Sequence, residues 1–96
     1  MARSVMGNGR GCYVCGDNSY LESHHIFFGG RNRNKAEQDG LKVLLCYEHH
    51  RGTSGVHGRD GHSLDLKLKQ EAQRIWMEYY NKTTEDFIKR YGRNYL

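Results

Sequence analysis

The chain has 96 residues, which is enough for one domain with a small core. Hydrophobic residues make up only 36% and the mean hydropathy is −0.90, so we expect a disulfide or a bound metal ion to support the fold. Three cysteines cannot all pair, which excludes a complete disulfide framework and favours metal. No apolar run approaches the roughly 20 residues that span a bilayer, and residues 1–10 lack the apolar segment of a signal peptide. We therefore expect a cytoplasmic protein without a membrane partner.

The formal net charge is +4 and the pI is about 9.1, which fits a polyanionic partner such as nucleic acid. Arg31, Arg33 and Lys35 alternate with asparagines, and a second basic group lies near the C-terminus in residues 89–93. Many unrelated proteins carry a similar excess, so the charge alone does not identify the partner.

The first half of the chain contains short segments separated by glycines. Residues 1–10 are rich in Gly, Asn, Arg and Ser, and we expect a mobile arm there. Residues 12–28 indicate a cysteine turn followed by a short hairpin, with turn residues at 16–18. Residues 29–40 are polar with glycines at both ends, which predicts a loop. The apolar run from Leu41 to Tyr47 has the length of a strand.

The second half indicates two helices. Apolar residues recur at helical spacing from Leu64 to Tyr79, and Ser63 is the expected N-cap. A second helix follows, with Thr83 or Thr84 as its N-cap and Gly92 at its end.

Two pairs of residues have the spacing of zinc ligands. Cys12 and Cys15 are separated by two residues, as in a zinc knuckle, and Cys46 and His49 have the same spacing. Together they form a Cys₃His set, which is typical of closed structural zinc sites. The alternative is that Cys12 and Cys46 are small buried hydrophobic residues. A lone CxxC would also fit a redox motif, but the second pair at equal spacing favours zinc.

Five histidines lie outside that set: His24, His25, His50, His57 and His62. A zinc ion with four protein ligands does no chemistry, so these residues need a separate explanation. A neutral imidazole can bind a second metal ion or accept a proton near pH 7. The alternative is that they are ordinary surface histidines, and we expect this of His62.

The segments CYVCG, SHHIFFGG and LKVLLCYEHHRG occur in this order. The combination, from Cys12 to His57, resembles the HNH nuclease family, particularly small phage-type members with a ββα-metal fold and a treble-clef zinc. The resemblance implies an α+β fold. A zinc-stabilised treble-clef unit over residues 11–58 would be followed by two helices over residues 63–92, in a single domain of residues 1–96.

By position in the motifs, the resemblance implies that His24 and His50 bind a catalytic divalent cation, which would be Mg²⁺, Mn²⁺, Ni²⁺ or Zn²⁺. It implies that His25 is the general base. The glycines at 52 and 55 are expected to form a turn that returns His57 to the site, as a third metal ligand or a phosphate contact. The family's usual asparagine is absent before the strand, and we expect Asn34 or backbone groups near Gly40 to replace it. The residues expected to contact the substrate are Arg31, Arg33, Asn34 and Arg51.

Three functions fit these patterns. The first is a metal-dependent HNH endonuclease that hydrolyses DNA, in the cytoplasm of the host cell if the chain is encoded by a phage. A homodimer or a phage protein is a further candidate partner. The second is a catalytically inactive zinc-knuckle module that binds nucleic acid. The third is a zinc-stabilised protein-interaction domain.

Overall fold

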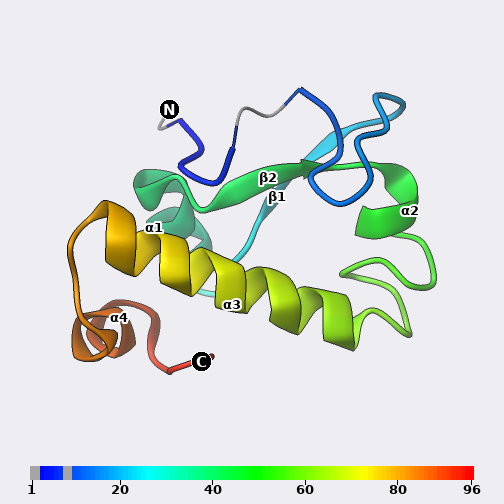
Figure 1. The fold of residues 1–96 in the computed structure, drawn as a ribbon. Helices are drawn as coiled ribbons and strands as arrows, with labels where there is room; N and C mark the ends of the chain where they lie inside the picture. The colour runs from blue at the N-terminus through cyan, green and yellow to red at the C-terminus, as the bar shows by residue number, and fades with distance from the viewer. Residues whose placement is uncertain (1–2, 8–9) are drawn as a thin grey trace.

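The computed structural model describes residues 3–7 and 10–96, and it shows a compact α+β domain (Figure 1). The mobile arm expected at residues 1, 2, 8 and 9 lies outside the described residues. Within the described residues there are two strands and four helices. In chain order they are β1 (Glu22–His25), α1 (Asn32–Asp39), β2 (Lys42–Leu45), α2 (Tyr47–His50), α3 (His62–Tyr79) and α4 (Thr84–Tyr91).

The two strands form an antiparallel sheet in which Glu22 lies opposite Leu45 and His25 lies opposite Lys42. The hairpin predicted within residues 12–28 is wrong, because β1 is the one strand in that segment and its partner is β2. The cysteine turn packs against β2 instead, since the Tyr13 N–H donates to the Leu44 carbonyl at 2.8 Å. The strand predicted over residues 41–47 is confirmed in its central part, but residue 47 already begins α2.

The loop predicted over residues 29–40 is also wrong, because most of this segment is helix α1. Ala36 is its one buried residue, so the segment shows no apolar periodicity. Gly40 ends the helix with φ 75°, and its N–H bonds to the carbonyls of Ala36 and Glu37. Lys35 Nζ donates to the Arg90 carbonyl at 2.7 Å, which ties α1 to the end of α4. Polar contacts with distant residues therefore hold this helix.

The two C-terminal helices occur as expected. α3 begins two residues earlier than predicted, at His62, and Gly61 rather than Ser63 is its N-cap. A Cβ atom at Gly61 would lie 1.6 Å from the Gly55 carbonyl oxygen, so the loop before α3 needs glycine at this close approach. α4 has Thr83 as its N-cap, with a capping box, and ends at Gly92, which confirms the prediction.

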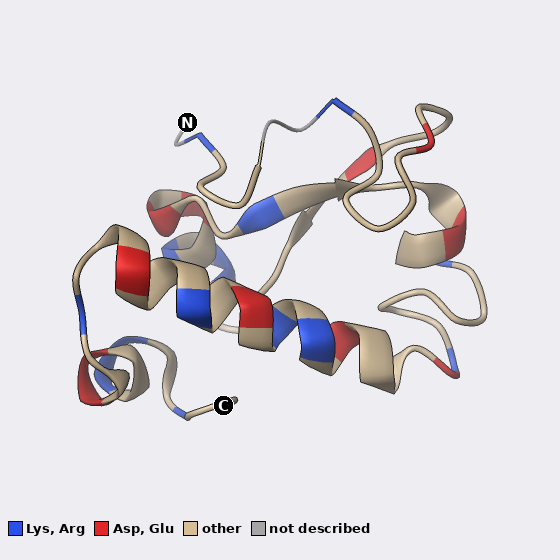
Figure 2. Cartoon of the chain, viewed as in Figure 1, with Lys and Arg blue, Asp and Glu red and all other residues tan. Residues whose placement is uncertain are grey.

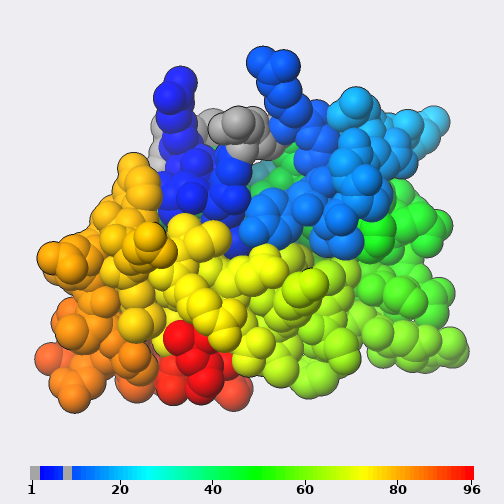
Figure 3. Space-filling model, in the orientation of Figure 1, coloured from blue at the N-terminus to red at the C-terminus, as the bar shows by residue number. Residues whose placement is uncertain are grey.

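The core lies between the sheet, α3 and α4. The Phe27 ring contacts the rings of Phe87 and Tyr91, with centroids 5.4 and 4.7 Å apart. Described residues near both ends of the chain pack onto this body, and Figure 3 shows such residues against α3. Met6 is buried and the Val5 N–H bonds to the Gly40 carbonyl. Val5 and Met6 therefore pack against the domain, whereas Arg3 and Gly7 are exposed.

Asp39, at the end of α1, connects three helices through its carboxylate. Trp76 Nε1 of α3 donates to it at 2.9 Å, and Tyr91 Oη of α4 donates at 2.7 Å. Arg90 adds an ion pair, with Nη2 at 2.9 Å from Oδ1. This half-buried carboxylate therefore connects the end of α1 to α3 and α4.

The outer surface of the long helix is mixed in charge. Lysine and arginine alternate with acidic residues along α3 (Figure 2), as expected for a solvated helix face. In the described part of the chain, none of the helices has both the length and the apolar character needed to cross a membrane.

Candidate metal centres

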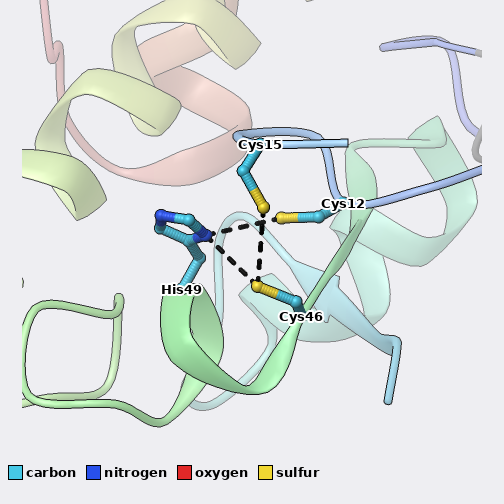
Figure 4. A group of neighbouring side chains, drawn as sticks. All are labelled: Cys12, Cys15, Cys46 and His49. Atoms are coloured by element: carbon cyan, nitrogen blue, oxygen red, sulfur yellow. Dashed lines mark hydrogen bonds between the residues drawn. The ribbon is translucent and has the colours of Figure 1, made fainter. Parts of the chain in front are cut away.

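Four of the predicted ligands meet at one point between the N-terminal turn and α2 (Figure 4). Cys12 and Cys15 lie on the turn before β1, which the Gly16 N–H closes by bonding to the Cys12 carbonyl at 2.8 Å. Cys46 follows β2 and is the N-cap of α2, and His49 lies in that helix. The strand therefore delivers the second pair of ligands to the turn that carries the first.

The distances in this cluster are those of ligands around one ion. Cys15 Sγ lies 3.8 Å from Cys46 Sγ. His49 Nδ1 lies 3.7 Å from Cys12 Sγ and 3.2 Å from Cys46 Sγ. With a zinc–sulfur bond of about 2.3 Å, two thiolates at neighbouring corners of a tetrahedron lie about 3.8 Å apart. All three cysteines are described and none forms a disulfide. The donor set and its spacing therefore fit a metal ion such as zinc.

The electrostatics of Cys12 favour the metal-binding form of the thiol. Burial raises its pKa, but hydrogen bonds from the backbone N–H groups of Cys46, Cys15 and Val14 outweigh that effect and lower the pKa to about 6. The thiolate is the form that binds metal, so it is already the main form at neutral pH.

A second cluster contains His24, His50 and His57, whose ligand atoms all lie within 4.8 Å of one another. His24 comes from β1 and His50 ends α2. The loop after α2 folds back, since the His57 N–H bonds to the His50 carbonyl at 3.0 Å. The His50 and His57 ring centroids are 4.8 Å apart, and each lies 5.2 Å from that of His24. We call these three residues the histidine cluster.

The state of these rings fits a divalent cation. His24 is 3% exposed, and its Nε2 has no hydrogen-bond partner in the part of the chain that the structure describes. Burial, followed by the charges of His50 and His57, lowers the pKa of His24 to about 3, so the ring is neutral at pH 7. An unpaired buried nitrogen is costly, and a bound metal ion would remove that cost.

Glu22 orients one ring of the histidine cluster. Its Oε1 lies 2.8 Å from His50 Nδ1 and 2.8 Å from Arg51 Nε. With Nδ1 as the donor to this carboxylate, Nε2 of His50 carries the lone pair that a metal ion needs. Glu22 was not among the site residues predicted from the sequence. Its position two residues before His24 is a usable signal, because alternate residues of a strand lie on the same face.

His25 does not belong to the histidine cluster. Its Nε2 lies 2.8 Å from Oε1 of Glu37 in α1, and Lys42 Nζ lies 2.8 Å from the other oxygen of that carboxylate. The sheet register places His25 and Lys42 opposite each other, so the Glu37 carboxylate can contact both side chains. Lys42, and then His25, lower the pKa of Glu37 to about 2, so it is ionised at neutral pH. No sequence signal pointed to Glu37, and Asn34 is exposed.

The histidines border a small open hollow of about 180 Å³. Its lining residues are Ser23, His24, His25, Phe28, Arg33, His50 and His57. Of the residues expected to contact substrate, Arg33 therefore lies at the hollow and Arg51 is bonded to Glu22 beside it. Arg31 and Asn34 are exposed and are not among its lining residues. His62 is exposed at the start of α3.

No protein-family model, curated protein or solved structure matches the chain. The assignment to the HNH family therefore remains a prediction from the motifs.

Proposed function

We propose that this chain is a metal-dependent endonuclease of the HNH type, which hydrolyses DNA phosphodiester bonds. In this proposal residues 11–58 are a ββα-metal, treble-clef unit with a structural zinc at the Cys₃His cluster. The observation that carries the proposal is the arrangement around the hollow. Three histidines converge on one side of it, and a fourth, His25, lines it while hydrogen-bonded to a carboxylate.

A divalent cation held by the histidine cluster would supply charge stabilisation at the phosphate and at the leaving oxygen. Because Glu37 is ionised, it can only accept at this contact, so the Nε2–H form of His25 would donate to it and Nδ1 would accept a proton from the attacking water. The water oxygen bonds to phosphorus as the bond from phosphorus to the 3′-oxygen breaks. Glu37 then stabilises the protonated ring, as carboxylates beside catalytic histidines do.

Arg33 has the position to hold a phosphate oxygen at the hollow. Contacts of this kind position the nucleic acid but do not read its bases. We therefore propose a nuclease with little sequence specificity of its own.

The test is plasmid cleavage by wild type and His25→Ala, with His62→Ala as a matched control on an exposed histidine. Assays contain Mg²⁺, Mn²⁺ or Ni²⁺. We expect His25→Ala to lower the cleavage rate by about 10²- to 10⁴-fold, the usual contribution of a general base. Zinc content and DNA affinity should stay unchanged, and His62→Ala should cleave like wild type.

Cleavage by His25→Ala at the wild-type rate would contradict the proposed role of this residue. Salt-sensitive DNA binding by wild type, without cleavage in any of the three ions, would favour the catalytically inactive nucleic-acid-binding module instead.

A further inference from the structure

Two tyrosines are exposed on the surface beside the histidine cluster. Tyr20 is 87% exposed and Tyr47 is 56% exposed. They line an open hollow of about 510 Å³, and Glu22 and Arg51 complete its lining. The tyrosine rings contribute little to the core, whereas Phe27 and Phe87 are buried in it. Exposed aromatic residues that share one hollow are typical of a binding surface.

The backbone of Tyr20 adds an independent observation. Its φ is 51°, in the left-handed region that a bulky residue adopts only at a cost in energy. The residue lies just before β1, where glycine or asparagine would relieve that strain. A bulky aromatic side chain at this position is therefore unfavourable for folding, both in its backbone conformation and in its exposure to water. Such outliers point to function.

The tyrosine hollow and the histidine cluster are joined by one carboxylate. Glu22 lines the hollow and also hydrogen-bonds to His50 and to Arg51. The Arg51 side chain is 58% exposed, so its guanidinium is accessible to a phosphate. An apolar aromatic surface thus lies next to a cation on one side and to the candidate catalytic site on the other.

We infer that Tyr20, Tyr47 and Arg51 form a platform for an unpaired base of the DNA strand that is cleaved. We call these three residues the tyrosine platform. Base faces stack on exposed aromatic rings without regard to sequence, and Arg51 pairs with the neighbouring phosphate. In an intact duplex those faces are stacked on other bases. The platform therefore favours single-stranded or distorted DNA over a continuous duplex, and it rests on the proposed nuclease function for its substrate.

Binding is measured in the His25→Ala background, so that no cleavage complicates the assay. The probes are a single-stranded oligonucleotide that carries 2-aminopurine and the duplex of the same sequence. The test variant is Tyr20→Leu with Tyr47→Leu, which keeps apolar side chains but removes the rings. The conservative variant replaces both tyrosines by phenylalanine. Tyr79→Leu, on the 64% exposed tyrosine at the end of α3, is the matched control.

We expect the double leucine variant to raise the Kd for the single strand by about tenfold or more, as loss of base stacking does. The Kd for the duplex should change much less, and the quenching of 2-aminopurine should disappear. The double phenylalanine variant and Tyr79→Leu should bind like the parent. Zinc content and circular dichroism verify that each variant is folded.

Equal affinity of the parent and the double leucine variant for the single strand would overturn the inference. An equal loss of single-strand and duplex affinity would overturn it as well, because the surface would then not distinguish unpaired bases. These outcomes are separate from failure of the nuclease proposal, which would appear as a wild type that cleaves no DNA.

Discussion

The two candidate metal centres differ in the number of donors that the protein supplies. The Cys₃His cluster has four donors at tetrahedral spacing, which leaves no position open for substrate. The histidine cluster has three donors and borders a hollow that His25 and Arg33 also line. One donor set would thus enclose an ion completely, whereas the other would leave coordination positions open.

The short helix α2 belongs to both centres. His49 contacts Cys46, and the next residue, His50, belongs to the histidine cluster. An ion at the Cys₃His cluster therefore fixes the helix that carries a ligand of the other site. Metal binding at the histidine cluster should therefore depend on the ion at the Cys₃His cluster. The reverse should not hold, because His24 and His57 contribute no ligand to the Cys₃His cluster.

The largest effect should follow from Cys46→Ser, which removes the thiol that contacts both Cys15 and His49 in the Cys₃His cluster. Structural zinc contributes on the order of 10 kcal/mol to the folding of small domains. We expect this variant to lose zinc and its cooperative thermal unfolding, as measured by elemental analysis and circular dichroism. A folded, fully stable variant would show instead that Cys46 acts as a small buried hydrophobic residue.

We expect His24→Ala to destabilise the fold less than Cys46→Ser does, but to abolish metal binding at the histidine cluster. The variant should keep its zinc and its thermal unfolding transition, because the cysteines are untouched. Titration calorimetry with Ni²⁺ should show loss of the exchangeable site that wild type has, and cleavage should stop. Unchanged Ni²⁺ affinity would exclude His24 as a ligand.

Glu22→Gln tests the histidine cluster more finely, because it removes none of the three histidines and affects the orientation of the His50 ring. Loss of the carboxylate that bonds to His50 Nδ1 should weaken binding of the exchangeable ion by about 10- to 100-fold. Arg51→Ala is the matched control, since Arg51 also bonds to Glu22 but is not a ligand. An equal loss of affinity in Arg51→Ala would mean that Glu22 acts through the arginine.

The smallest effect that we expect is on the pH dependence of the free energy of unfolding. The pKa of His24 is lowered from 6.5 to about 3 in the folded chain, mainly by burial. As pH falls below about 6.5, the unfolded chain takes up a proton that the folded chain does not, so stability falls with pH. Between about pH 7.5 and pH 5.5, without added divalent ions, we expect wild type to lose more unfolding free energy than His24→Leu. Equal slopes would contradict the burial of a neutral His24.

The sequence predicted the features that depend on local spacing. Cys12, Cys15, Cys46 and His49 were selected by two equal intervals, and α4 was placed by Thr83 and Gly92 at its ends. These signals need no information about distant parts of the chain.

The features that were missed depend on distant contacts. α1 has one buried residue and is held by Arg90, Trp76 and Tyr91, more than 35 positions away in the sequence. The pairing of β1 with β2 spans that helix, and the contact between Glu37 and His25 follows from it. Local pattern cannot reveal such partners, because the folded chain alone brings them together.

The most direct test counts metal ions and asks whether one site depends on the other. Elemental analysis after dialysis should find one retained zinc per chain, and Ni²⁺ titration should find one additional exchangeable ion. Removal of the zinc with a strong chelator should abolish Ni²⁺ binding at the histidine cluster, whereas His24→Ala should leave the zinc in place. A chain that retains no zinc, or that keeps its exchangeable site after losing zinc, would contradict the account.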